Sequence, residues 1–225
     1  CSGKKVVLSN CLATLNPELV KEWHPTKNGD LTPFDVFSGS TKKVWWKCDK
    51  GDDHEWKVRI VARKDNGCPC CSGRKLALSN SLSYLYPNIA SLWHPHKNKY
   101  LRPDNLIANS HKKVWWKCDK GDDHEWEIDI SSRLVFNSGC PICAGQITVI
   151  SNCLQTTDPE IAKQWHPSKN GDLTPFDLTA GSSKKVWWKC DKGDDHEWRT
   201  RPVSRTSSAN TNCPYCTLTP QSKQE

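Results

Sequence analysis

Hydrophobic and polar residues alternate along the stretch KKVWWKC at 42–48. In an extended chain this pattern places Val44, Trp46 and Cys48 on one face and Trp45 and Lys47 on the other. The polar turn DKGDD follows, and EWKVRI at 55–60 then alternates again as far as Ile60. The pattern predicts a β-hairpin with one buried face.

A different pattern precedes this hairpin and predicts a short helix. An Asn-Pro pair at 16–17 places proline where the first helical residue tolerates it. Leu19 and Trp23 lie four residues apart and would share one helix face. The His-Pro pair at 24–25 ends the helix, because the residue before a proline disfavours helical geometry. A Gly-, Pro- and Asp-rich loop joins the helix to the hairpin.

The whole pattern occurs three times. The string KKVWWKCDKGDDHEW is found at 42–56, 112–126 and 184–198, and the 12 tryptophans fall four to a unit. Fixed repeats set the architecture of a chain, and units of this size need extra help to stay folded. Because Cys1-Ser2-Gly3 matches the CSG that closes the first unit, we expect a preceding repeat. The predicted organisation is a remnant of that repeat at 1–5, repeats at 6–75, 76–147 and 148–218, and a tail at 219–225.

The cysteines indicate how such small units are stabilised. Only 36% of the residues are hydrophobic, and 13 are cysteines. Each unit carries a C-x5-H pair followed by a C-P-x-C pair, and a loop of variable length joins the two. Two tight ligand pairs suit a tetrahedral zinc ion. Disulfides are the alternative, but each unit has three cysteines at shared positions and a histidine at the fourth. We therefore predict three closed, structural Zn²⁺ sites, with these ligands: Cys48, His54, Cys68 and Cys71; Cys118, His124, Cys140 and Cys143; Cys190, His196, Cys213 and Cys216.

Besides Cys1, three cysteines fall outside this ligand pattern. Cys11 and Cys153 align with Ser81, and Cys70 aligns with apolar residues of the other units. We interpret them as packing residues. The histidines of the three His-Pro pairs also lie outside the ligand pattern.

These residues resemble the treble-clef, zinc-ribbon-like repeat family. The resemblance rests on W-H-P-T-K-N at 23–28, on Val44–Trp56, on Arg63 and on C-P-C-C at 68–71, and the other units match in the same way. One departure is that two aspartates separate Gly51 from the ligand histidine, which enlarges the turn. The resemblance implies small α+β zinc-stabilised modules, here three tandem repeats of a short helix plus a β-hairpin. It also implies nucleic-acid binding, and such repeats often accompany nuclease-like domains.

The charge pattern allows nucleic-acid binding without requiring it. The formal net charge is +7, a mild basic excess. The repeated cations and Lys-Asn pairs suit contacts with phosphates or base edges. A solvated lysine-rich face and an asparagine that caps a turn are the alternatives. The candidate contacts are Lys27, Asn28, Lys42, Lys43, Lys47 and Arg63; Lys97, Asn98, Lys112, Lys113, Lys117 and Arg133; Lys169, Asn170, Lys184, Lys185, Lys189 and Arg205.

Selectivity should come from positions that differ between the repeats. Lys57 becomes Glu127 in the second repeat and Arg199 in the third, and the residue two positions later varies as Arg, Asp, Arg. Acidic residues repel phosphate, so the second repeat cannot use this strand as the others can.

Three functions remain open. The first is a tandem zinc array that binds nucleic acid, in particular duplex DNA, as the targeting part of a larger protein whose further domains are its partners. The second is a protein-interaction or structural array, with Trp45, Trp115 and Trp187 as exposed hot spots. The third is an RNA or single-strand binder that uses the same tryptophans for stacking.

The sequence does not favour an enzyme or a membrane protein. The predicted metal sites are closed, and no repeated carboxylate or Ser–His constellation lies outside them. No run of about 18 apolar residues is present. Free thiolate ligands indicate an intracellular, reducing compartment, the nucleus or the cytoplasm.

Overall fold

The computed structural model describes residues 5–135, 139–207 and 212–217. The chain forms two compact units, Cys1–Val114 with Asp129–Ser132, and Trp115–Ile128 with Arg133–Glu225. The tail expected at 219–225, and all but the last residue of the expected remnant at 1–5, lie outside the described residues.

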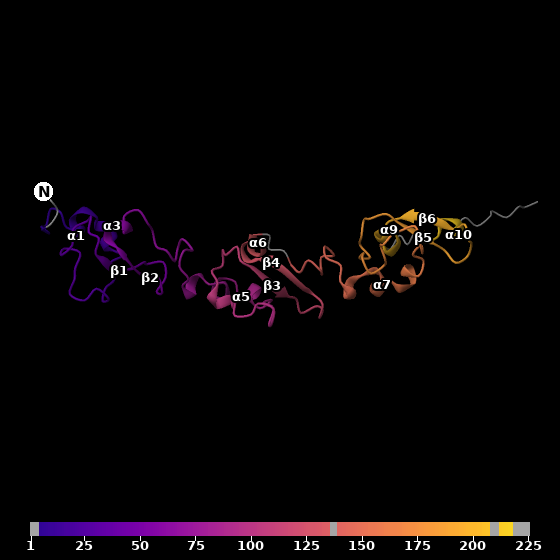
Figure 1. Ribbon diagram of the computed structural model, residues 1–225, viewed down its shortest axis with the longest axis horizontal. Coiled ribbons are helices and arrows are strands. Elements are labelled where there is room, and N and C mark those ends of the chain that lie inside the picture. The colour runs from indigo at the N-terminus through magenta and orange to yellow at the C-terminus, as the bar shows by residue number, and fades with distance from the viewer. Residues whose placement is uncertain (1–4, 136–138, 208–211, 218–225) are drawn as a thin grey trace, which may run out of the picture. The chain divides into compact units, whose positions relative to one another are not determined.

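The first unit begins with two single-turn helices and a hairpin (Figure 1). These are α1 (Leu12–Leu15), α2 (Pro17–Val20), β1 (Lys43–Lys47) and β2 (Glu55–Arg59), followed by α3 (Ile60–Arg63). The same order then starts again with η1 (Leu78–Asn80), α4 (Leu82–Leu85), α5 (Pro87–Ala90) and η2 (Pro103–Asn105).

The second unit contains most of the second hairpin and the whole of the third. Three elements are divided between the two units: β3 (Lys113–Lys117), β4 (Glu125–Asp129) and α6 (Ile130–Val135). The second unit then continues with η3 (Ile150–Asn152), α7 (Leu154–Thr157), α8 (Pro159–Ala162), β5 (Val186–Lys189), β6 (Glu197–Thr200), α9 (Pro202–Thr206) and α10 (Pro214–Thr217). Among the described residues each sheet has two strands, paired β1–β2, β3–β4 and β5–β6. The predicted small α+β modules are confirmed.

The predicted hairpin is confirmed with one change. In β1 and β2, Trp46 lies opposite Trp56 in an antiparallel register, and Val44 lies opposite Val58. The chain leaves the sheet one residue earlier than predicted, because Ile60 starts α3 instead of ending β2. The amide of Ile60 still donates to the carbonyl of Lys42, so the last hydrogen bond of the hairpin forms as the chain turns into the helix.

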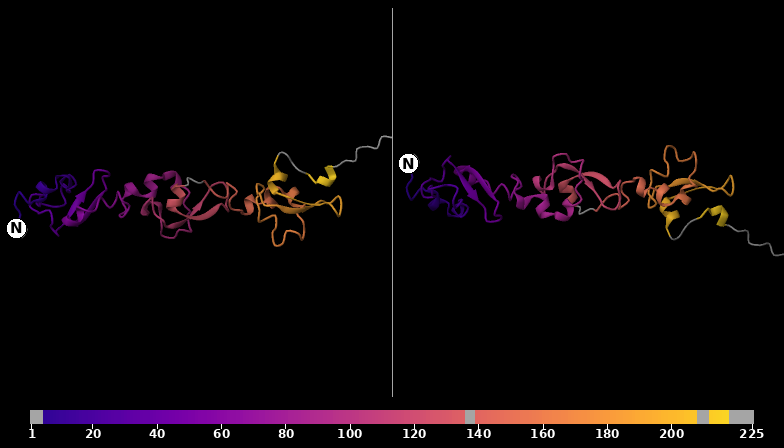
Figure 2. Two further views of the ribbon diagram at one scale, coloured as in Figure 1. Left: turned by 90° about the horizontal axis from the view of Figure 1, so that it is seen from above. Right: turned by 90° about the horizontal axis from the view of Figure 1, so that it is seen from below.

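The predicted helix is shorter than expected. Pro17 occupies its first position, as predicted, but α2 ends at Val20. Trp23 instead pairs with Trp46 in an isolated antiparallel bridge, and the amide of Lys47 donates to the carbonyl of Glu22 at 2.7 Å. The segment after α2 is thus drawn against the edge of β1, and the helices and hairpin lie side by side in all views (Figure 2).

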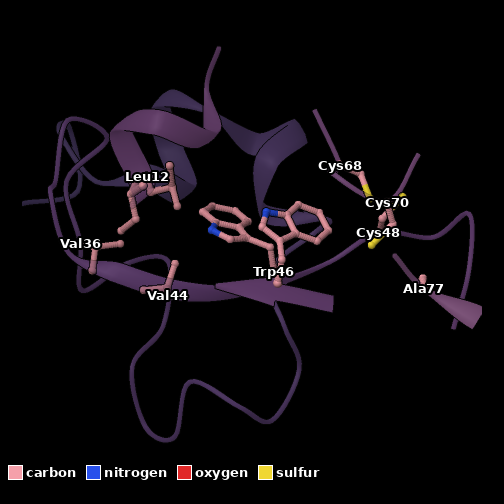
Figure 3. Close-up of a cluster of buried hydrophobic side chains, with 10 residues drawn as sticks. Leu12, Val36, Val44, Trp46, Cys48, Cys68, Cys70 and Ala77 are labelled. Atoms are coloured by element: carbon pink, nitrogen blue, oxygen red, sulfur yellow. The ribbon is translucent and has the colours of Figure 1, made fainter. Parts of the chain in front are cut away.

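Each hairpin covers a small core around one fully buried tryptophan. In the first repeat Trp46 has Leu12, Val36 and Val44 on one side and the cysteines on the other (Figure 3). The ring of Trp23 meets that of Trp46 edge to face, with centroids 5.6 Å apart. The arrangement recurs in the third repeat around Trp188. The core is therefore continuous with the cysteine cluster at the end of the hairpin.

Candidate metal centres

The hairpin brings the first two predicted ligands together. Cys48 directly follows β1 and His54 directly precedes β2. The amide of Cys48 donates to the carbonyl of His54 at 3.0 Å, which closes the loop between them. The C-P-x-C turn, from Cys68 to Cys71, then places two more thiols against the same histidine.

The structure gathers each predicted ligand set into one cluster. In every set the four ligand atoms lie within 4.8 Å of one another. The sets are Cys48, His54, Cys68 and Cys71; Cys118, His124, Cys140 and Cys143; Cys190, His196, Cys213 and Cys216.

The distances match those of a tetrahedral zinc site. With Zn–S bonds of about 2.3 Å and Zn–N bonds of about 2.0–2.1 Å, a tetrahedron has S···S edges of about 3.8 Å and S···N edges of about 3.6 Å. In the first site the sulfurs of Cys48 and Cys71 are 3.7 Å apart, and Nδ1 of His54 lies 3.7 and 3.4 Å from the sulfurs of Cys68 and Cys71. The corresponding distances are 3.8, 3.7 and 3.3 Å in the second site and 3.7, 3.7 and 3.5 Å in the third. A disulfide would need sulfurs about 2.05 Å apart.

A glycine in the enlarged turn makes room for the histidine. A Cβ atom at Gly51 would lie 2.8 Å from Cδ2 of His54, closer than real Cβ contacts. Gly121 and Gly193 face their histidines in the same way. With this glycine in place, the enlarged turn with its two additional aspartates still holds His54 in the ligand cluster.

Without a metal, the surroundings of these thiols favour their protonated form. Desolvation raises the pKa of Cys48, and desolvation and the neighbouring thiols raise the pKa of Cys71 to about 12. A cation that binds as a Lewis acid displaces these protons and converts the thiols to thiolates. Four protein ligands leave no open coordination position, which is the composition of a structural zinc centre.

The comparisons agree with this geometry. The model of one family, described as a probable treble clef zinc finger domain, matches residues 19–74, 89–146 and 161–219, which is more than half of the chain. The chain belongs to this treble clef zinc finger family. Each match contains one complete ligand set, so the array has three Cys₃His sites that fit three zinc ions. Comparison with curated proteins gave no match. Among the described residues, every helix is too short or too polar to cross a membrane.

The histidines of the His-Pro pairs form a second network that the sequence did not reveal. His24 is buried, and its Nε2 atom lies 3.0 Å from a carboxylate oxygen of Glu55. Its Nδ1 atom accepts hydrogen bonds from the amides of Thr26 and Lys27. Hydrogen bonds from Lys27 and His24 lower the pKa of Glu55 to about 2. His166 and Glu197 repeat the arrangement in the third repeat. The only sign of this network in the sequence is that both residues recur in each repeat.

The asparagines predicted to contact nucleic acid bind the protein's own backbone. The side-chain amide of Asn28 donates to the carbonyl of Trp45 at 2.9 Å and accepts from its amide at 2.7 Å. Asn170 holds Trp187 in the same way. Asn98 is buried. We therefore assign these asparagines to the frame of the module.

The three predicted arginines are also part of the frame. Arg63, Arg133 and Arg205 are between 2 and 6% exposed. The guanidinium carbon of Arg205 lies 4.7 Å from the ring centroid of Trp188 and 5.1 Å from that of Trp198, and Arg63 lies over two tryptophans in the same way. Little of these groups is left for a phosphate.

The predicted lysines divide into those that contact other residues of their module and those that form no ion pair. Lys27 and Lys169 pair with glutamates and lie over tryptophan rings at 5.0 Å, and Lys97 donates its amide to His94. The half-buried Lys47, Lys117 and Lys189 lie 3.7 to 3.9 Å from carboxylates. The exposed lysines at the start of the first strand of each hairpin, or just before it, form no ion pair within the described parts of the chain; they are Lys42, Lys43, Lys112, Lys113, Lys184 and Lys185.

The cysteines outside the ligand pattern are packing residues, as interpreted from the alignment of the repeats. The thiol of Cys11 is buried and donates to the carbonyl of Leu8, and Cys153 does the same with Ile150. Cys70 is buried in the core cluster, and desolvation raises its pKa to about 11.

Proposed function

We propose that this zinc array binds nucleic acid, specifically duplex DNA, through the outward faces of its first and third hairpins. One observation carries the proposal: Lys43 lies directly opposite Arg59 in the register of β1 and β2. Like charges at directly opposed positions of a hairpin destabilise it. An anionic partner would offset that cost.

The neighbouring positions extend the same face. Lys57 lies opposite Trp45, and both Lys57 and Arg59 are exposed. In the third repeat Arg199 lies opposite Trp187. The second repeat has Glu127 at this position, so we do not include its second strand in the interface.

The surroundings of the tryptophans favour a duplex over a single strand. A stacking platform for bases must offer an open ring face. The half-buried ring of Trp45 instead has Lys27 over it at 5.0 Å and His24 against it with a centroid distance of 6.5 Å. Exposed lysines and arginines around a covered ring suit phosphates. The closed zinc sites would act as a rigid frame that presents the binding face. We therefore include in the proposal that this array is the targeting part of a larger protein.

The test is the affinity of the zinc-loaded chain for duplex DNA, single-stranded DNA and RNA over a salt series. We expect the strongest affinity for the duplex, falling steeply as salt rises because bound phosphates release counterions. The variant Lys57→Glu/Arg59→Asp gives the first hairpin the acidic residues of the second and should weaken binding at least about tenfold. The control is Lys21→Glu/Lys163→Glu, which changes the net charge equally at the exposed residues that directly follow α2 and α8.

Each outcome decides between the candidates. Equal weakening by both double variants would show that only net charge matters and would contradict the proposed face. A preference for single strands or RNA would favour the stacking alternative. No salt-dependent binding by chains shown to hold three zinc ions would leave the protein-interaction array as the better function.

A further inference from the structure

The turn that starts the second repeat contacts the metal centre of the first. The hydroxyl of Ser79, in η1, lies 3.0 Å from Nε2 of His54 and donates to Asp53 at 2.6 Å. The amide of Ser79 donates to the other oxygen of the same carboxylate at 2.9 Å. A chain of hydrogen bonds therefore runs from one repeat's histidine through the next repeat's serine to an aspartate.

The two ring nitrogens of His54 have separate tasks. Nδ1 faces the thiols of Cys68 and Cys71, so it is the ligand atom and carries no proton when the metal is bound. Nε2 then carries the proton and donates a hydrogen bond to the hydroxyl oxygen of Ser79. Such an outer hydrogen bond fixes the tautomer and the ring orientation and strengthens the ligand.

Two further contacts hold the turn in place. The side-chain amide of Asn80 donates to the carbonyl of Cys70, inside the C-P-x-C turn, at 2.8 Å. Ala77, which precedes η1, is only 9% exposed and belongs to the core cluster of the first repeat. The start of the second repeat is thus packed onto the first repeat's metal-binding turn.

The next boundary repeats these contacts. The hydroxyl of Ser151, in η3, lies 3.2 Å from Nε2 of His124, and its amide donates to Asp123 at 2.9 Å. Asn152 donates to the carbonyl of Ile142 at 2.9 Å, as Asn80 does to Cys70. Two boundaries share the histidine–serine contact, the amide–aspartate bond and the asparagine–carbonyl bond, which makes an accidental contact a poor explanation.

The first repeat supplies an internal reference. Its equivalent turn contains Ser9, which is exposed and contacts none of the ligand histidines in the described residues. Val7, at the position of Ala77, is 47% exposed.

We propose that Ser79 and Ser151 are positioning residues for the zinc centres of the repeats before them. The first and second zinc centres are then each completed by the repeat that follows, and retention of their metals depends on that repeat being docked. The coupling has a direction, because the serine comes from the C-terminal neighbour at both boundaries. The array would hold its metals as a linked series instead of as three independent sites.

The test is the rate of zinc release from the 225-residue chain to an excess of a colour-forming chelator. In Ser79→Ala we expect one third of the released zinc to leave about tenfold faster, because loss of an outer-shell partner weakens metal binding by about 10–100-fold. Ser79→Ala/Ser151→Ala should move two thirds. Ser9→Ala is the matched control and should move none, and Ser79→Thr, which keeps the hydroxyl, should restore the wild-type rate.

Several results would overturn the proposal. Unchanged release from Ser79→Ala would remove the link, and so would an equal effect of Ser9→Ala. Acceleration of all three metals together would show general destabilisation. Failure of Ser79→Thr to restore the rate would show that packing, and not the hydroxyl, is responsible. Circular dichroism of each zinc-loaded variant identifies a loss of fold, and Ser151→Ala then tests the second boundary independently.

Discussion

The buried side chain of Arg63 forms an ion pair with the half-buried Glu22, which lies 41 residues earlier in the chain. The same guanidinium lies over Trp46 and Trp56, 5.8 and 5.6 Å from their ring centroids. Arg63 therefore ties the segment after α2 to the hairpin and packs against its two inner tryptophans. In the third repeat Arg205 keeps the tryptophan contacts but bonds the neutral Gln164 at 2.9 Å.

This pairing predicts unequal effects for the two partners. Arg63→Ala leaves the half-buried carboxylate of Glu22 unpaired and removes the ring contacts, so we expect it to lower the free energy of unfolding by about 2 kcal/mol. Glu22→Gln should cost much less, because the third repeat already uses glutamine at this position. Urea unfolding of zinc-loaded chains, followed by tryptophan fluorescence, measures both. Equal losses in the two variants would contradict the interpretation.

The clamp formed by Asn28 gives a second prediction. Because its side chain satisfies both the amide and the carbonyl of Trp45, Asn28→Ala should destabilise the first repeat by about 1–3 kcal/mol. Asn28→Asp should be at least as harmful, since a carboxylate cannot donate to the carbonyl. Hydrogen exchange at the amide of Trp45 is the direct measurement. Normal protection in Asn28→Asp would show that the clamp does not hold the strand.

The sequence predicted the features that depend on local spacing. Alternation in KKVWWKC placed Val44 and Trp46 inward, and the C-x5-H and C-P-x-C pairs identified all four ligands of each site. Both follow from short-range geometry, which the chain encodes directly. The helix was overestimated because Trp23, at helical spacing from Leu19, pairs with Trp46 instead.

The sequence could not separate structural from functional use of a repeated polar residue. Arg63 and Asn28 recur in all three repeats and were predicted to contact nucleic acid, but one is buried and the other binds backbone. A residue needed for the frame recurs for the same reason as one needed for a partner. The contact between Ser79 and His54 joins two repeats, so no pattern within one repeat could indicate it.

The raised thiol pKa values predict a steep pH dependence of zinc binding. The pKa of Cys48 is raised and that of Cys71 is raised to about 12, so both thiols carry protons at neutral pH without a metal. Zinc must displace these protons, and its contribution to stability is therefore lost as the pH falls. Because these two thiols each release a proton when zinc binds, we expect the logarithm of the apparent association constant of the first site to rise by at least about two per pH unit between about pH 6 and 8. Competition with a chelator of known pH dependence measures this slope, and a slope below about one would contradict the prediction.

Two cysteines of the C-P-C-C turn in the first repeat, Cys68 and Cys70, allow a sharp test of the ligand assignment. Cys68 belongs to the tetrahedral cluster, whereas Cys70, two residues later, is buried in the core and does not belong to any of the three clusters. Cys68→Ser should reduce the zinc content from three ions to two, as measured by mass spectrometry of the native protein. Cys70→Ser should keep all three ions and lose stability through the buried hydroxyl alone. If Cys70→Ser lost a metal and Cys68→Ser kept all three, Cys70 instead of Cys68 would be the ligand in the C-P-C-C turn.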